Sequence, residues 1–441
     1  MSRGVRGGLL FHHRDFRLLW CGETAGKYGA AVTGVTIPLL AVSTLDATTF
    51  EVGLLSATAW APWLLIGLPV GVWVDRWRRR PVMLAAAAVS LVLFASVPIA
   101  AWTGWLSIGL LLAVALSTGT AAVFFHTAYS AYLPSILEPE DQPEGNAKLH
   151  GSASAAQIAG LGSGGLIAQL AGAVNGLLAN AATFLVSLLC LAGIRHREPR
   201  VTRAERRPAT LFGEVREGLG LIAGDPWLRA FTLFGAASNL ALMGYQSIQV
   251  VFLVRTVGLG PGLVGTLVAA TSAGGVAGAL FARRVAGRIG TARATLLFEL
   301  GLPTLALLIP FTVDGAGVLF FLAGGFCVSA GVVAGNVIKA SFQQRYCPPD
   351  LLGRLTASTA FLGYGTIPLG ALLGGALGTV LGLRTAIAVM AAAVPLAALI
   401  LVFSPIRRAR DLPTSPGPTS GSRRPGGGRA GGGGAGRGGA G

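Results

Sequence analysis

The stretch GVWVDRWRRRP, residues 71–81, decides the fold. An apolar run ends at Val74, one acid and four arginines follow, and a second apolar run begins at Val82. Charges gather in short stretches of this kind. Only 12% of the 441 residues are charged and 53% are hydrophobic, whereas a soluble domain carries about 25% charged residues. The pattern predicts an all-α polytopic membrane protein, in which residues 75–80 form a short turn between two membrane-spanning helices.

Twelve apolar segments are long enough to cross a bilayer, which takes about 20 residues of α-helix. The first segment is too long for the apolar core of a signal peptide, so we expect no cleaved leader. The predicted spans are 17–44, 52–75, 81–102, 105–133, 147–172, 174–194, 227–254, 262–286, 293–312, 315–340, 354–381 and 384–404.

The distribution of basic residues predicts the orientation. When both termini are placed in the cytoplasm, all but four of the 34 Lys and Arg residues fall on the cytoplasmic side. Arg255 and Arg384 fall outside, and Lys27 and Lys339 lie within spans. Because cytoplasmic loops are enriched in Lys and Arg, we expect a multi-pass protein of the plasma membrane with both termini cytoplasmic and the lipid bilayer as its main partner.

Composition also argues against several other classes of protein. The net charge of +16 comes from short loops and a Gly-rich tail, and not from a basic stripe on a folded domain, so nucleic acid is not an expected partner. The four cysteines show no paired spacing, and we expect neither a disulfide framework nor a metal site.

The second half of the chain repeats the first at an offset of 210 residues. Pro139 matches Pro349, and GLGSGG (160–165) matches GALLGG (370–375). Two related six-helix halves are typical of transporters whose site lies between the halves. Small residues let helices approach closely. The glycines expected to pack helices are Gly160, Gly164, Gly165, Gly370, Gly374 and Gly375.

The repeat, the middle loop and the tail divide the chain into four regions. Apolar residues at helical spacing between Leu211 and Ile222 predict a surface helix in the middle loop, lying on the membrane. We expect Asp225 to cap the next helix and Pro226 to occupy its first turn. The Gly-rich tail is expected to be disordered. The predicted regions are 1–194 (N-terminal half), 195–225 (cytoplasmic linker), 226–404 (C-terminal half) and 405–441 (tail).

The chain resembles the major facilitator superfamily. The signature of that family between helices two and three is matched by Gly71, Asp75, Arg76, Arg79 and Arg80, while Arg78 stands where the signature has a glycine. FRLLWCGE (16–23), EGLGLIAGDPWLRA (217–230) and PPDLLGR (348–354) resemble the macrolide-efflux and enterobactin-exporter branch of drug:proton antiporters. The resemblance implies alternating access between two halves. It also implies a cytoplasmic gate in which Asp75, with Arg76 and Arg80, clamps the cytoplasmic side by bridging to the other half when the cavity opens outward.

Polar side chains concentrate on helices one, four, seven and ten, which line the central cavity in the family that this chain resembles. Glu23 and Lys27 are either a structural ion pair or part of a proton or substrate site. Lys339 is expected to face the cavity or to pair with Glu23. Glu299 is expected either to reach back to the membrane surface or to pack near the loop between helices eight and nine. The candidate pathway residues are Glu23, Lys27, His126, Tyr129, Asn239, Tyr245, Gln246, Gln249, Asn336, Lys339 and Gln343.

These observations predict a monomeric secondary-active transporter rather than an enzyme. No phosphate-binding loop motif for a nucleotide is present, so we expect energy from an ion gradient, with protons favoured and Glu23 as the carrier. No cofactor is expected. The favoured activity is export of a small amphipathic organic molecule such as a drug, antibiotic or siderophore. The alternatives are a nutrient importer of the same fold and a transport-inactive scaffold or sensor.

Overall fold

The computed structural model describes residues 9–196 and 211–415. Helices account for nearly all of this part of the chain, as predicted. The N-terminal half contains α1 (Leu9–His12), α2 (Arg14–Ser43), α3 (Thr49–Leu65), α4 (Gly67–Arg76), α5 (Arg79–Trp102), α6 (Ile108–Ile136), α7 (Gln142–Ala171) and α8 (Ala173–Gly193).

The linker contributes one helix, and the C-terminal half follows it. These elements are α9 (Leu211–Gly224), α10 (Pro226–Val251), η2 (Phe252–Thr256), α11 (Pro261–Ile289), α12 (Thr291–Leu296), η3 (Leu297–Gly301), η4 (Pro303–Phe311), η5 (Gly315–Gly317), α13 (Val318–Tyr346), α14 (Pro349–Val380), α15 (Leu383–Val402) and η6 (Pro405–Arg408).

Twelve membrane-crossing segments are present in the described residues, which confirms the predicted number. Three of them are composite: α3 with α4, α10 with η2, and α12 with η3 and η4. Ten of the twelve are long and apolar enough to be identified as spans by length and hydropathy alone. The other two are α3 with α4, which a break interrupts, and α7, which is rich in glycine, serine and alanine.

The break in the second span lies at Ile66, between α3 and α4. Pro69 has no N–H to donate to the carbonyl of Leu65, so the regular helical hydrogen bond cannot form there. A different irregularity occurs in the ninth span. Leu302 donates to the carbonyl of Leu297, five residues back, at 3.0 Å. This widened turn contains Glu299, and such π-helical turns frequently occur at functional sites.

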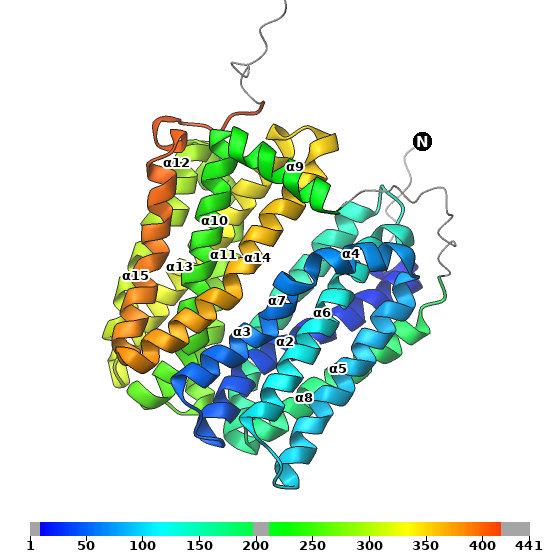
Figure 1. Ribbon diagram of the computed structural model, residues 1–441, viewed down its shortest axis with the longest axis vertical. Helices are drawn as coiled ribbons and strands as arrows, with labels where there is room; N and C mark the ends of the chain where they lie inside the picture. Colours follow the sequence, from blue (N-terminus) through cyan, green and yellow to red (C-terminus); the bar gives the residue numbers. More distant parts are fainter. Residues whose placement is uncertain (1–8, 197–210, 416–441) are drawn as a thin grey trace, which may run out of the picture.

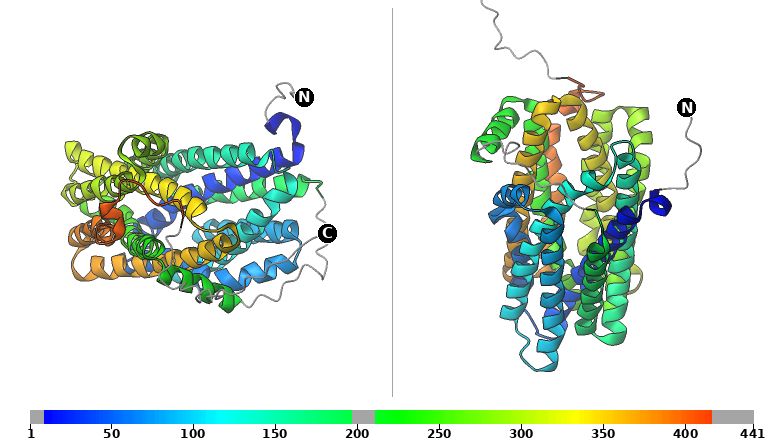
Figure 2. Two further views of the ribbon diagram at one scale, coloured as in Figure 1. Left: turned by 90° about the horizontal axis from the view of Figure 1, so that it is seen from above. Right: turned by 90° about the vertical axis from the view of Figure 1, so that its right-hand side faces the viewer.

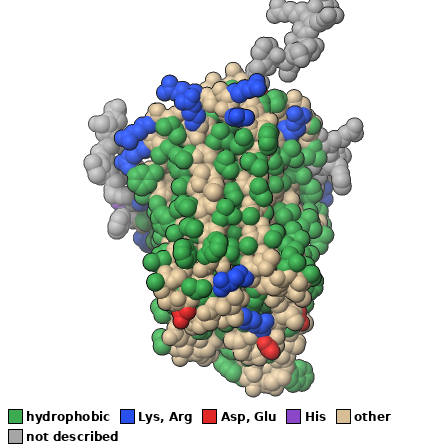
Figure 3. All heavy atoms as spheres, turned by 90° about the vertical axis from the view of Figure 1, so that its left-hand side faces the viewer, with side chains coloured by type: hydrophobic (Ala, Val, Ile, Leu, Met, Phe, Trp, Pro, Cys, Tyr) green, Lys and Arg blue, Asp and Glu red, His purple; other side chains and the backbone are tan. Residues whose placement is uncertain are grey.

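The two halves lie side by side and make most of their mutual contacts at one end (Figure 1). We call this the far end; it carries the α2–α3 and α5–α6 connections. At the opposite end, where α4 ends and α9 lies, the halves diverge (Figures 1 and 2). Arginines gather there, and we call it the basic end. Figure 3 shows an apolar band over the flank of the C-terminal half, with basic side chains along the rim at the basic end.

The predicted linker helix is present as α9. In its described part, Ile222 is buried and Gly218 packs against the Arg354 carbonyl and the Ser358 side chain of α14. The helix therefore rests on protein and not only on the membrane surface. Asp225 accepts hydrogen bonds from the N–H groups of Trp227 and Leu228 at 2.8 and 3.0 Å, which confirms the predicted cap. Residues 197–210 of the linker and 416–441 of the tail lie outside the described residues.

Candidate functional site

Four of the predicted residues form one cluster in the N-terminal half. Lys27 Nζ lies 3.4 Å from Glu23 Oε1, one turn away on α2. The Lys27 side chain is 47% exposed and that of Glu23 only 12%. Two side chains of α6 lie within electrostatic range of this pair: His126 interacts with the charge of Lys27, and Tyr129 interacts with the charge of Glu23. The structure thus brings α2 and α6, which are the first and fourth predicted spans, together at a polar surface, as the sequence predicts.

An aromatic group joins this cluster to the other half. The ring of Trp63 lies 5.2 Å from that of His126 and 5.1 Å from that of Tyr364, which belongs to α14. Trp60 lies 6.1 Å from Trp63 and 6.2 Å from Tyr364. Aromatic rings at these separations attract one another, so the group connects the halves beside the Glu23–Lys27 pair.

The pattern of strongly polar side chains in the sequence does not identify these three aromatic residues. The available signal was AWAPW (59–63), in which two tryptophans stand three residues apart on one helix face in the middle of a span. Tyr364 carries no comparable signal, because its role depends on contact with the opposite half.

The C-terminal half contains a second acid and lysine. Glu299 is only 6% exposed. Its charge interacts with that of Lys339 on α13, and its carboxylate rests on Gly335, one turn earlier on that helix. Of the two alternatives expected for Glu299, its burial contradicts reaching the membrane surface. The charge partner of Lys339 is Glu299 rather than Glu23. Glu299 lies in the widened turn, and regular helical periodicity does not predict the direction of a side chain there.

The remaining polar candidates occupy different environments. Asn239 donates to the Gly363 carbonyl at 3.2 Å and thereby ties α10 to α14. Tyr245 is buried in the hydrophobic core, with 5% of its surface exposed. Gln246 and Asn336 are exposed, and Gln249 and Gln343 are half-buried. Of these six side chains, Gln246 and Asn336 are the most accessible.

Two of the predicted glycines close the far end. A Cβ on Gly165 of α7 would lie 2.6 Å from the Cα of Gly265 of α11. A Cβ on Gly53 of α3 would lie 2.8 Å from the Cα of Gly375 of α14. Both pairs join the N-terminal half to the C-terminal half, and neither leaves room for a side chain.

The other four predicted glycines pack helices within each half. Gly160 and Gly164 approach the α2 backbone at Tyr28 and Val32. Their counterparts in the repeat behave alike, because Gly370 and Gly374 approach the α10 backbone at Leu240 and Gly244. The equivalence of the two sets shows that the repeat seen in the sequence is also a repeat of helix contacts.

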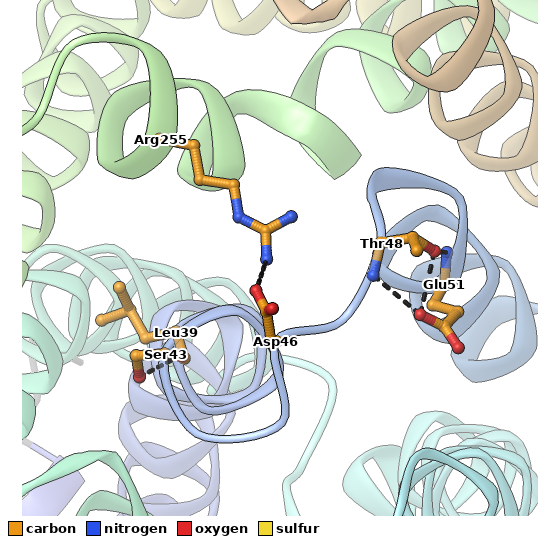
Figure 4. Close-up of polar contacts among 6 residues, drawn as sticks. All are labelled: Leu39, Ser43, Asp46, Thr48, Glu51 and Arg255. Atoms are coloured by element: carbon orange, nitrogen blue, oxygen red, sulfur yellow. Dashed lines mark hydrogen bonds and ion pairs between the residues drawn. The ribbon is translucent and has the colours of Figure 1, made fainter.

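One ion pair also joins the halves at the far end (Figure 4). Arg255 donates from Nη2 to Asp46 Oδ1 at 2.7 Å. The Asp46 side chain is 99% exposed and its backbone φ is +48°. Just after it, Thr48 and Glu51 form a reciprocal cap that starts α3.

The predicted gate motif occupies the basic end, between α4 and α5. Arg80 donates to the carbonyls of Leu191 and Ala192 at 3.1 and 2.7 Å. These carbonyls end α8, where a cation is favoured by the helix dipole. Arg80 thus ties α5 to α8 within its own half. Arg76 is exposed, Arg79 is half-buried, and nothing lies within 4 Å of a Cβ placed on Gly71. The Asp75 side chain lies outside the described part of the structure.

Comparison with known proteins gives concordant matches. The family profile of the Major Facilitator Superfamily matches residues 19–365. The multidrug efflux pump Tap of Mycobacterium tuberculosis (strain ATCC 25618 / H37Rv) is 26% identical over 401 residues, which cover 87% of this chain and 92% of that protein. Tap of Mycobacterium bovis (strain BCG / Pasteur 1173P2) matches with the same values.

Solved structures share the fold at low sequence identity. The nucleoside transporter NupG superposes with a TM-score of 0.69 at 11% identity, covering 88% of this chain and 98% of NupG. A bacterial homologue of the lysosomal transporter Spinster, inward-facing and occupied, gives 0.70 at 14% identity over 91% and 98% of the two chains. A bacterial homologue of ferroportin, inward-facing, gives 0.68 at 14% identity over 88% and 98%.

Proposed function

Since the chain belongs to the major facilitator superfamily, we propose that it is a secondary-active exporter of a small amphipathic organic molecule, driven by the proton gradient. It is a multi-pass membrane transport protein and not an enzyme. We further propose that it works as a monomer and that the basic end is cytoplasmic, because membrane proteins concentrate Lys and Arg on that side.

The contact between the halves at the far end is the observation that carries this proposal. Closure there, with divergence at the basic end, leaves the inner surfaces of the halves accessible from the basic end. The Glu23–Lys27 pair, His126 and Trp63 lie on these surfaces. A molecule with an apolar body and a polar group would match such a combination of rings and charges. The likeness to a multidrug efflux pump over nearly its whole length supports export.

Glu23 is the proposed proton carrier. Ionisable groups inside a membrane cost at least about 2.5–3.5 kcal/mol each and tend to mark ion pathways. Glu23 is the accessible acid, and Glu299 is the buried one beside Lys339. We place proton exchange at Glu23. Because the Lys27 side chain is exposed, it can leave the Glu23 carboxylate when that group binds a proton.

The Asp75 motif is proposed to hold the basic end together in the opposite, outward-open state. Arg76 is exposed at that end and free to meet the other half as the halves rock together. In this scheme, Asp75→Asn lowers transport without lowering the amount of protein in the membrane.

The test uses inside-out vesicles and a fluorescent amphipathic dye. An imposed proton gradient should drive dye into vesicles that contain the protein, and a protonophore should abolish uptake. Equal uptake with the proton gradient collapsed and no other ion gradient present would rule out coupling. Uptake only in right-side-out vesicles would make the protein an importer. A deletion strain with unchanged drug susceptibility and metabolite release would favour a scaffold.

A further inference from the structure

A groove lies in the N-terminal half between α7 and α8, with α2 as its floor. Its volume is about 870 Å³, which falls within the roughly 300–1,000 Å³ of small-molecule sites. Cys21, Thr24 and Tyr28 of α2 line it. Glu23 and Lys27 lie on a different face of that helix, so the groove is separate from the polar cluster described above.

Three hydrogen bonds close the floor of the groove by tying α2 to α7. Trp20 Nε1 donates to the Lys148 carbonyl at 3.4 Å, Thr24 Oγ1 donates to Ser152 Oγ at 3.0 Å, and the Tyr28 and Ser163 hydroxyls lie 2.7 Å apart. Because these contacts follow the helix from turn to turn, the groove does not lead through to the inner surface. An occupant must enter from the outer flank of the half.

That flank faces the hydrocarbon of the bilayer. Leu185, Val186 and Leu189 of α8 are 44%, 46% and 63% exposed, and Val186 also lines the groove. Exposed aliphatic side chains on a membrane-spanning helix mark its lipid-facing side. Most of the remaining lining is alanine, from all three helices. Small apolar side chains along a channel open to lipid leave space for a hydrocarbon chain, whose burial there is favourable.

The end of the groove nearest the basic end is positively charged. Arg14 and Arg17 precede Cys21 at the spacing that keeps residues on one helix face, and both are exposed. Arg17 donates to the carbonyl of Leu10, a lining residue, at 3.3 Å. Lys148 lines the same end and lies 3.3 Å from Glu144. These three cations outnumber the carboxylate of Glu144, which leaves a net positive charge at the mouth.

We infer that this groove binds one anionic phospholipid of the leaflet at the basic end. An acyl chain lies along the alanine-lined channel, and the phosphate lies among Arg14, Arg17 and Lys148. Basic pockets between transmembrane helices on the cytoplasmic side bind anionic headgroups. The apolar channel ends at the basic mouth, in the same order as the acyl chain and headgroup of a phospholipid. The lipid site does not depend on the substrate or direction of transport.

Native mass spectrometry of the purified full-length protein tests the inference. Phosphatidylglycerol and phosphatidylcholine with identical acyl chains are titrated separately, and the fraction of protein carrying one lipid is measured. Phosphatidylglycerol should bind more tightly. Changing Arg14, Arg17 and Lys148 to Gln together should weaken its binding about fivefold for each cation removed. The matched control changes three exposed basic residues of the other half, Arg283, Arg284 and Arg288, to Gln and should leave binding unchanged.

Filling the groove provides a second variant. Ala155→Phe occupies the channel and should abolish binding of both lipids, whereas Gln157→Phe, an exposed position of α7 outside the lining, should not. Equal affinity for the two lipids, or equal loss in the control variants, would overturn the inference.

Cys21 allows a measurement that leaves the groove intact. In a protein with Cys190, Cys327 and Cys347 changed to Ser, the alkylation rate of Cys21 by an apolar maleimide is followed in detergent. Added phosphatidylglycerol should slow the reaction severalfold, and phosphatidylcholine should slow it less. Alkylation that is indifferent to phosphatidylglycerol would show that no such lipid occupies the groove.

Discussion

Gly165 of α7 and Gly265 of α11 pack backbone against backbone between the two halves at the far end. A Cβ on Gly165 would lie 2.6 Å from the Gly265 Cα and from the Pro261 carbonyl oxygen. Gly53 and Gly375 repeat this arrangement between α3 and α14. The closed far end therefore depends on two related places where both helices lack side chains, and a side chain at either place would oppose closure.

Gly165→Ala should shift the protein away from the state in which the far end is closed. Overpacking costs about 1–3 kcal/mol, which corresponds to roughly a thirtyfold change in the population ratio at the middle of this range. Dye transport in vesicles should fall by a similar factor, and a cysteine introduced at the far end should react faster with a water-soluble reagent.

The matched control lies on the same helix. A Cβ on Gly162 would be 3.5 Å from the Ala269 Cβ, an ordinary contact, so Gly162→Ala should transport normally. Gly53→Ala should behave like Gly165→Ala because it disturbs the equivalent contact. Equal transport by the Gly162 and Gly165 variants would show that the glycine contact is not needed for closure of the far end.

The ion pair between Arg255 and Asp46 should matter much less than the glycines. Both groups are at least partly exposed, and exposed pairs contribute about 0.2–1 kcal/mol. Asp46→Asn, which keeps a residue that tolerates positive φ, should lower transport less than about fivefold, and the effect should shrink at high salt. A double-mutant cycle with Arg255→Gln measures the coupling. A coupling energy above about 2 kcal/mol would show that the pair is a principal latch.

The cap of α3 should respond to pH. The backbone N–H and side chain of Thr48 hold the pKa of Glu51 below its usual value. A lowered pKa in the folded state means that the cap stabilises α3 above the ordinary pKa of about 4.3, and that this stabilisation is lost as pH falls through the lowered value. The difference in Tm between the wild type and Glu51→Ala should therefore be constant near neutrality and vanish in acid. A difference that persists unchanged below that range would contradict this assignment.

The sequence predicts the fold well because its signals are local. Apolar length gives the spans, Asp225 and Pro226 give a helix start, and the repeat gives the equivalence of Gly160 and Gly370. Contacts between segments far apart in the chain are not accessible in this way. Helical periodicity does not predict the contact of Glu299 with Lys339, because Glu299 lies in a widened turn. Nor does it predict the role of Trp63, because this depends on the ring of Tyr364 in the other half.

Glu299 and Lys339 should depend on each other for stability. Removing one partner of a buried pair costs about 3–5 kcal/mol, because the other charge is left buried alone. Glu299→Gln should therefore lower Tm substantially, and Glu299→Gln with Lys339→Met should restore much of it. Glu23→Gln should lower Tm little, because the Lys27 side chain is 47% exposed and can be hydrated.

Transport by the double variant separates structure from function at this pair. Restored Tm with restored proton-driven dye transport would make the pair structural only. Restored Tm without transport would add Glu299 or Lys339 to the pathway. A Glu299→Gln variant as stable as the wild type would mean that the two charges do not support each other.

Trp63 should contribute directly to substrate affinity. Its ring contacts His126 in its own half and Tyr364 in the other, at 5.2 and 5.1 Å. Aromatic pairs are worth about 0.5–1.5 kcal/mol beyond their burial, so Trp63→Ala should raise the KM for an aromatic dye roughly two- to tenfold. Trp63→Phe keeps a ring and should lose less. Trp73, an exposed tryptophan of α4, serves as the control, and Trp73→Ala should leave KM unchanged. If Trp63→Ala lowers only the maximal rate and leaves KM as it was, the aromatic group acts in the movement of the halves and not in substrate binding.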